Sequence, residues 1–250
     1  MSTLSDLIYE KSKDLIDEAY DKGRNAGGYG EGFEAGQDAL WDAVQNNGTR
    51  TDYSYAFANW RVEYLRPKHK VIPTVVTGVA NAFLYCKGLK KIESQYFDFS
   101  QKPYATGYNR GYDYLCAVAS DLEEIEDIGL VPQCTYQYAF SSCSKLHTIA
   151  KLGSDETTTF TDTFAWCSAL KNITIDGVIG QNISFANSSL LSVASMDSIY
   201  AALKTYTSGT HTLTLHASAW ARWDAAYPSL VAQYGSMKNY VTSTKGWATS

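Results

Sequence analysis

Three kinds of side chain in this sequence could do chemistry: histidines, clustered carboxylates and cysteines. Histidine is the commonest metal ligand and general acid or base, and these uses need partners at defined spacings. The four histidines are His69, His147, His211 and His216, and none of them has a partner at such a spacing. The sequence also lacks a G-x-S-x-G motif and a P-loop. It therefore predicts no catalytic residue, no metal site and no cofactor.

The carboxylates gather in one short stretch, which contains Asp121, Glu123, Glu124, Glu126 and Asp127. A Ca²⁺ site there is conceivable, because calcium binds carboxylate oxygens. Successive side chains of a strand, however, point to opposite faces. A solvated edge is therefore the favoured interpretation of this cluster.

The five cysteines form no C-x-x-C pair, so their spacing predicts no zinc site. They are Cys86, Cys116, Cys134, Cys143 and Cys167. A disulfide between Cys143 and Cys167 is geometrically possible if their strands are neighbours. The odd number and the missing signal peptide favour free, buried thiols instead.

Cysteine also belongs to a recurring pattern, F-x-x-C-x-x-L-x-x-I, that must position everything else. The last two copies end at Ile149 and Ile173, and a worn copy with Cys116, Ala119, Leu122 and Ile125 precedes them at the same spacing. This period, in the twenties, is typical of a solenoid, whose units bury their apolar rows against one another. The expected repeat core is Phe83, Cys86, Leu89, Ile92, Leu122, Ile125, Phe140, Cys143, Leu146, Ile149, Phe164, Cys167, Leu170 and Ile173.

One interval in the array, from Ile92 to Ile125, is longer than the regular period. The surplus falls in the tyrosine-rich stretch 95–114, and insertions in repeat proteins often form the binding face. Two interpretations stay open: the tyrosines bind a ligand, or they pack the insertion against its neighbours. The candidate ligand contacts are Tyr104, Tyr108, Tyr112 and Tyr114.

The N-terminal segment has helical periodicity over 3–22 and 31–45, separated by a glycine-rich break. These helices are too exposed to be stable alone, so the repeats or other copies of the chain must cover their apolar stripes. The predicted domains are an attachment and oligomerisation segment, 1–66, the repeats, 67–194, and a capping unit, 195–250. The expected oligomerisation residues are Leu4, Ile8, Leu15, Phe33, Leu40 and Trp41.

The composition limits the partners. The net charge is −5, and no basic patch indicates nucleic-acid binding. No apolar run is long enough for a signal peptide or a membrane helix, which predicts synthesis in a cytoplasm without export by the secretory route. The 19 tyrosines suit either a binding surface or a strand-rich core.

The repeat pattern resembles the BspA-type leucine-rich repeat of bacteria. The stretch Asn47–Phe57 and the tail, with a helix, a Thr-Leu-Thr-Leu strand and a final Lys-Gly-Trp, resemble the two ends of proteins encoded by phages and prophages of gut Firmicutes. The worn copy and the missing Ile-Pro after the strand depart from the pattern. The resemblance implies a fold and a setting, and it carries no catalytic residues.

The sequence thus predicts an α+β protein: a BspA-type leucine-rich-repeat solenoid of about five coils, with N-terminal helices and an α/β C-terminal cap. The expected function is a non-enzymatic virion protein that recognises a host-surface glycan or protein, binds other virion proteins through 1–66 and forms a homo-oligomer, with a trimer as the first expectation. The alternatives are an architectural head or tail decoration protein and a bacterial surface adhesin. An enzyme such as a wall hydrolase is disfavoured, because no carboxylate pair is recognisable.

Overall fold

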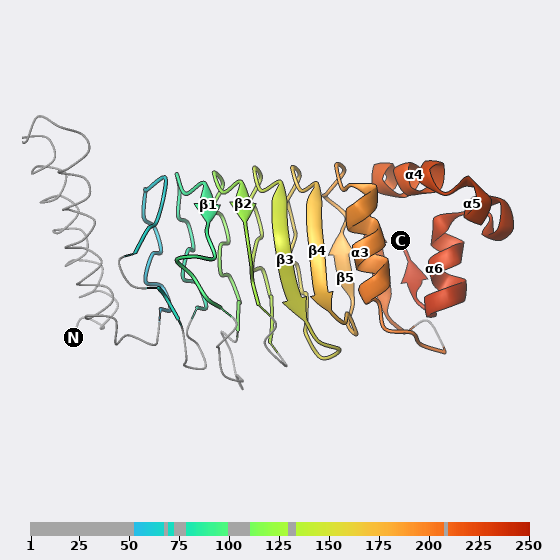
Figure 1. Ribbon diagram of the computed structural model, residues 1–250, viewed down its shortest axis with the longest axis horizontal. Coiled ribbons are helices and arrows are strands. Elements are labelled where there is room, and N and C mark those ends of the chain that lie inside the picture. The colour runs from blue at the N-terminus through green and yellow to red at the C-terminus, as the bar shows by residue number, and fades with distance from the viewer. Residues whose placement is uncertain (1–52, 68–69, 73–78, 100–110, 130–133, 208–209) are drawn as a thin grey trace, which may run out of the picture. The chain divides into compact units, whose positions relative to one another are not determined.

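A computed structural model describes residues 53–67, 70–72, 79–99, 111–129, 134–207 and 210–250 (Figure 1). The chain divides into two compact units, Met1–Thr51 with Arg66–Val71, and Asp52–Leu65 with Ile72–Ser250. All helices and strands with defined bounds belong to the second unit.

Five strands come first along this unit, and helices alternate with two further strands after them. The strands are β1 (Lys91–Ile92), β2 (Glu124–Ile125), β3 (Thr148–Ser154), β4 (Asn172–Gly177), β5 (Ile183–Phe185), β6 (Thr212–Leu215) and β7 (Ala248–Thr249). The helices are α3 (Val193–Ala202), α4 (Ala217–Ala226), α5 (Pro228–Tyr234) and α6 (Met237–Lys245). Figure 1 shows β1 to β4 side by side in chain order, followed by α3 and then by the other helices.

All strand pairs are parallel. The first sheet has the order β1-β2-β3-β4, and the second has the order β5-β6-β7. In the first sheet the repeat isoleucines are in register, with Ile92 opposite Ile125, Ile125 opposite Ile149 and Ile149 opposite Ile173. The repeat unit therefore returns the chain to the same position one strand further along.

The expected fold class, an α+β leucine-rich-repeat solenoid of about five coils, is wrong. The described residues form an α/β arrangement of two parallel sheets, of four and three strands, with four helices. The segment with Phe185, Ser188 and Leu191, which matches the repeat pattern in part, does not extend the first sheet. Helix α3 covers the edge of β4 instead. The backbone N–H groups of Ile173 and Ile175 donate to the Ser195 and Ser198 hydroxyls, each at 2.9 Å. The expected N-terminal helices lie outside the described residues.

Helix α3 also begins earlier than its sequence suggests. The pattern predicts a helix over 195–206 with Ser195 as its N-cap, but the Ser192 hydroxyl caps α3 by accepting from the Ser195 N–H. The Ser195 hydroxyl instead accepts a hydrogen bond from the backbone of β4. The strand 212–215 and the helix 217–226 have the bounds that their patterns predict.

The core contains a row of stacked aromatic rings. Phe140 lies 5.8 Å from Phe164, and Phe164 lies 4.5 Å from Phe185, measured between ring centroids. Cys116 interrupts this row, and residues of the long interval continue the contacts: Phe97 lies 5.4 Å from Phe83, and Phe99 lies 6.2 Å from Tyr112. The described part of the insertion thus packs the core where a repeat phenylalanine is missing.

Candidate binding surface

Each repeat unit contains a turn segment, which precedes the strand of that unit in the sequence. The turn segments are residues 54–59, 79–85, 111–118, 137–142 and 161–166. Alternate N–H groups of these segments donate to the next unit, as Tyr114 does to Gln137 and Tyr138 does to Thr161, each at 2.9 Å. The intervening groups donate three residues back, as Ser141 does to Tyr138 at 3.1 Å. Backbone hydrogen bonds therefore join the turn segments of neighbouring units, as they join the strands of a sheet. Equivalent side chains of the turn segments lie in rows as a result.

Two rows of these segments have positive φ. Among the described residues, ten other than glycine adopt it, two per unit and four residues apart: Tyr55, Asn59, Asn81, Tyr85, Tyr114, Val118, Tyr138, Ser142, Asp162 and Trp166. This conformation normally favours glycine or asparagine and is strained for bulky side chains. Strained backbone persists where the surrounding structure enforces it and is enriched at functional sites. We call these ten residues the turn-side surface; all of them except the buried Asn81 are at least partly exposed.

Half of the turn-side surface is aromatic, and several of its rings face solvent. The exposed fractions are 48% for Tyr55, 46% for Tyr85 and 66% for Trp166. Tyr114 and Tyr138 are half-buried and stack on each other with ring centroids 5.1 Å apart. The Tyr138 hydroxyl is hydrogen-bonded to Asp162, which raises the pKa of Tyr138. Aromatic side chains have few rotatable bonds, so they lose little entropy when a ligand binds.

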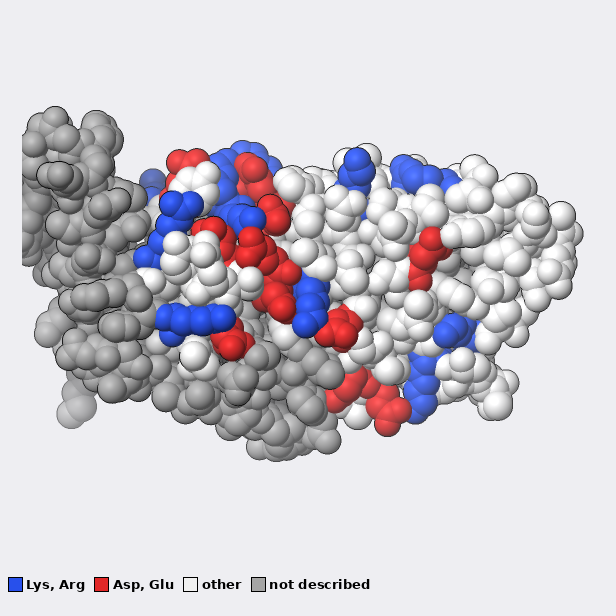
Figure 2. Space-filling model, in the orientation of Figure 1, with Lys and Arg blue, Asp and Glu red and all other residues white. Residues whose placement is uncertain are grey.

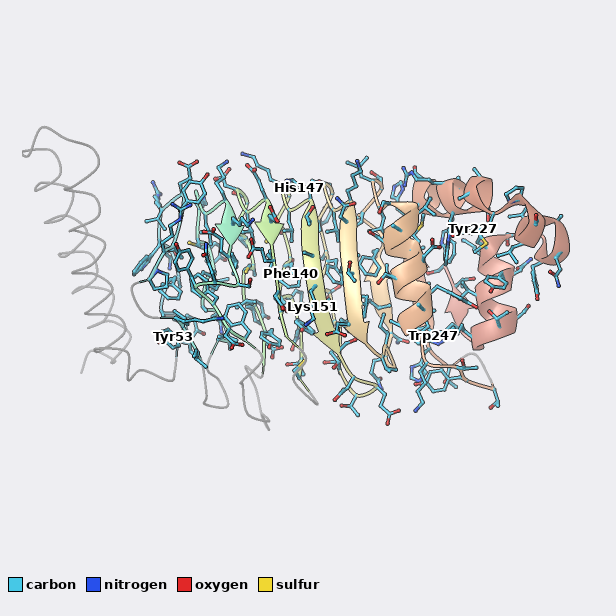
Figure 3. All side chains as sticks on the ribbon, in the orientation of Figure 1. Tyr53, Phe140, His147, Lys151, Tyr227 and Trp247 are labelled. Carbon is cyan, nitrogen blue, oxygen red and sulfur yellow. The ribbon has the colours of Figure 1, made fainter. Side chains whose placement is uncertain are left out.

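The strand side differs in charge, because lysines and carboxylates alternate across the strands (Figure 2). The pairs include Lys91 with Glu126 at 2.7 Å and Lys145 with Asp121 at 2.6 Å. A hydrogen bond from Lys145 lowers the pKa of Asp121, and one from Lys91 lowers the pKa of Glu126. Figure 3 shows His147 at the start of β3 and Lys151, which bridges Asp127 and Asp176, farther along.

These ion pairs explain the acidic cluster, because lysine ammonium groups contact its carboxylate oxygens. Among the residues that the structure describes, no group of histidine, cysteine and carboxylate side chains could hold a metal ion. The described histidines have local roles: His216 caps α4 through Nδ1, and His211 packs between Tyr206 and Trp247. His69 lies outside the described ranges.

The candidate ligand contacts are separated. Tyr104 and Tyr108 lie outside the described residues, as do all six expected oligomerisation residues. Tyr112 is fully buried, stacks on Tyr136 and donates to the Phe99 carbonyl at 2.8 Å. Tyr114 belongs to the turn-side surface. The structure therefore places Tyr112 in the core and Tyr114 where a ligand can reach it.

Sequence reasoning missed Tyr85, Tyr138 and Trp166, although a signal was present. Tyr85 and Trp166 follow a repeat phenylalanine by two residues, and Tyr138 precedes one by two residues. The turn-side surface consists of the positions two before and two after each phenylalanine or its substitute, Cys116. The repeat pattern could have marked these positions, but not their outward direction.

The expected repeat core residues are all buried, with at most 2% of any of them exposed. The five cysteines are free and buried as well. Burial raises the pKa of Cys86 and of Cys167 to about 12, and it also raises the pKa of Cys116 and of Cys143 well above the usual range. The thiolate that reacts with disulfide reagents is therefore scarce at neutral pH.

We accordingly expect the folded protein to be inert to Ellman's reagent at pH 8, because thiol exchange needs an accessible thiolate. In denaturant all five cysteines should react. The measurement is the absorbance released with and without guanidinium chloride, using glutathione as the control for reagent activity. Rapid reaction of one or more thiols in the folded protein would contradict their burial.

Within the described ranges, no helix combines the length and the apolar character that a membrane span requires. Comparison of the sequence with protein-family models and with curated proteins, and of the chain with solved structures, finds no match.

Proposed function

We propose that this protein is a non-enzymatic binding protein whose turn-side surface contacts a ligand on a host cell. One observation carries the proposal: aromatic side chains occupy backbone positions where asparagine or glycine would be less strained. Burial does not account for Trp166, Tyr85 and Tyr55, because about half or more of each side chain is exposed.

The same chain shows that the backbone does not need these aromatics. Asn59 and Asn81 hold equivalent positions with φ of 65° and 60°. Tyrosine and tryptophan are the residues that most often anchor binding interfaces, because they combine a large apolar area with a polar tip. A surface that accepts strain to display them fits recognition better than space filling.

The proposed setting is a phage or prophage particle, and its support is the resemblance of the two chain ends. In this setting residues 1–66 attach the protein to other virion proteins and assemble it into a homo-oligomer, first of all a trimer. Recognition by the turn-side surface does not depend on the number of copies, since each copy carries its own rows.

The test is binding of the fluorescently labelled full chain to Gram-positive gut bacteria of the Firmicutes. A triple variant, Tyr85→Asn, Tyr138→Asn and Trp166→Asn, should lose at least about tenfold in affinity and keep its melting temperature within a few degrees. The control is Tyr64→Ala, which removes an aromatic that is 40% exposed and pairs with the strand-side Lys91.

Two outcomes count against the proposal. Wild-type protein that binds no cells but still joins particles would favour the architectural decoration role. Equal loss of binding in the triple variant and in Tyr64→Ala would remove the turn-side surface from recognition.

A further inference from the structure

Trp166 has the most exposed aromatic side chain of the turn-side surface. Its row neighbours are short: Ser142 lies in the preceding unit, where its N–H donates to the Ala165 carbonyl at 2.8 Å. In the following unit the Asn187 side-chain oxygen accepts from the Trp166 backbone N–H at 3.1 Å. Tyr114 and Tyr138 cover each other, whereas no ring of the described residues stacks on Trp166. The faces of this indole are thus left for a ligand.

Polar residues are the neighbours of Trp166 in the array. Ser142 precedes it in its row, Asn187 binds its backbone N–H from the following unit, and Thr161 and Asp162 are exposed on the same turn segment. The indole N–H forms no hydrogen bond within the described part of the chain. Hydroxyl, amide and indole groups around one flat apolar face match a sugar ring, which has an apolar C–H face and a rim of hydroxyls.

The charge of the turn-side surface further limits the chemical class of the ligand. Of the ten turn-side residues, nine are uncharged and one, Asp162, is acidic. Phosphate or carboxylate ligands are recognised by arginine and lysine, which these rows lack. Protein interfaces centre on a contiguous apolar core with arginine enriched. Here Asn81 lies between Tyr55 and Tyr114 in one row, and Ser142 separates Trp166 from Val118 in the other. The ligand that fits best is neutral and rich in hydroxyls.

From this geometry we infer that the turn-side surface binds a neutral carbohydrate chain, with the C–H face of one sugar ring packed on the indole of Trp166. This inference rests on the proposed function and specifies its ligand. Backbone hydrogen bonds between the units hold the site before the ligand arrives, so little ordering opposes binding.

The experiment titrates the full chain with soluble neutral polysaccharides, a glucan, a galactan and a mannan, and with the anionic hyaluronate and polyglycerol phosphate. The signal is tryptophan fluorescence. Among the tryptophans that the structure describes, Trp60, Trp220, Trp223 and Trp247 are each at most 6% exposed, and the comparison with Trp166→Asn isolates the contribution of Trp166. At least one neutral polymer should change the emission, and the anionic polymers should not. Trp166→Asn should weaken that binding by at least about tenfold, as scored by affinity electrophoresis, and Trp166→Phe should weaken it less.

A second arm separates this inference from the proposed function. Cells treated with periodate, which cleaves sugar diols, should lose binding of the wild-type protein, and cells treated with protease should keep it. If protease abolishes binding and periodate does not, the ligand is a protein and the carbohydrate inference is wrong, while the proposed function stands. If wild type binds neither polymers nor untreated cells, both fail. Binding of the anionic polymers alone would also overturn the inference.

Discussion

Replacing Phe140 with alanine is expected to lower the free energy of unfolding by about 3–5 kcal/mol, the usual cost of deleting a buried aromatic ring. Phe140 is fully buried and stacks on Phe164, and its centroid lies 6.3 Å from that of Tyr136. Rows on either side are fixed by backbone hydrogen bonds, such as that from the Phe140 N–H to the Thr163 carbonyl at 3.0 Å. The cavity therefore cannot collapse easily. Equilibrium unfolding in urea measures the loss.

The matched control is Tyr85→Ala, two residues after the equivalent Phe83. Tyr85 has a comparable ring but is 46% exposed, so its removal should cost less than about 1 kcal/mol. A similarly small loss for Phe140→Ala would mean that the aromatic row does not stabilise the core.

Replacing Gly246 with alanine is expected to cost roughly 3 kcal/mol, near the upper end for single substitutions. Gly246 ends α6 with a φ of +70°, which is unfavourable for alanine. An added Cβ would also lie 2.1 Å from the carbonyl oxygen of Tyr206, a backbone atom that cannot swing aside. The clash would push α6 away from the segment that contains Lys204 and Tyr206. The indole N–H of the buried Trp247 donates to the Lys204 carbonyl in that segment. The measurement is the shift of the denaturant concentration at the unfolding midpoint, with the m-value unchanged.

Gly235 provides the control, because it ends α5 in the same left-handed region with a φ of +85°. Its added Cβ would meet only the side-chain amide of Asn239 at 3.2 Å, which can move. Gly235→Ala should therefore cost about 1 kcal/mol, the strain of the backbone alone. Equal losses at both glycines would show that the close approach to Tyr206 does not matter.

The apolar repeat allowed much of the core to be identified from the sequence. Phe140, Leu146 and Ile149 recur at a constant spacing, and a constant spacing places equivalent residues beside one another whenever the strands are parallel. The fold class was nevertheless wrong, because it depended on how the array ends. Hydroxyls of α3 cover the N–H groups of β4, and no local pattern identifies Ser195 and Ser198 as partners of a strand in the preceding unit.

The candidate site was predicted less well. Clustered tyrosines in the long interval drew attention to Tyr112, which the structure buries in a second stacked row with Tyr136 and Phe160. Residues near the repeat phenylalanines, such as Trp166, had no cluster to mark them. They lie at the two positions of each turn segment that have positive φ, and side-chain periodicity does not report backbone handedness.

The sequence by itself determined which apolar repeat residues are buried and at what spacing the chain returns, because apolar periodicity is a local property of the sequence. The tertiary structure alone decided which strand ends the first sheet, which tyrosines face solvent and which carboxylates meet lysines. Those outcomes depend on hydrogen bonds and ion pairs between residues of different units, such as Lys145 with Asp121 and Ser195 with Lys171. Such pairings exist only once neighbouring units have stacked.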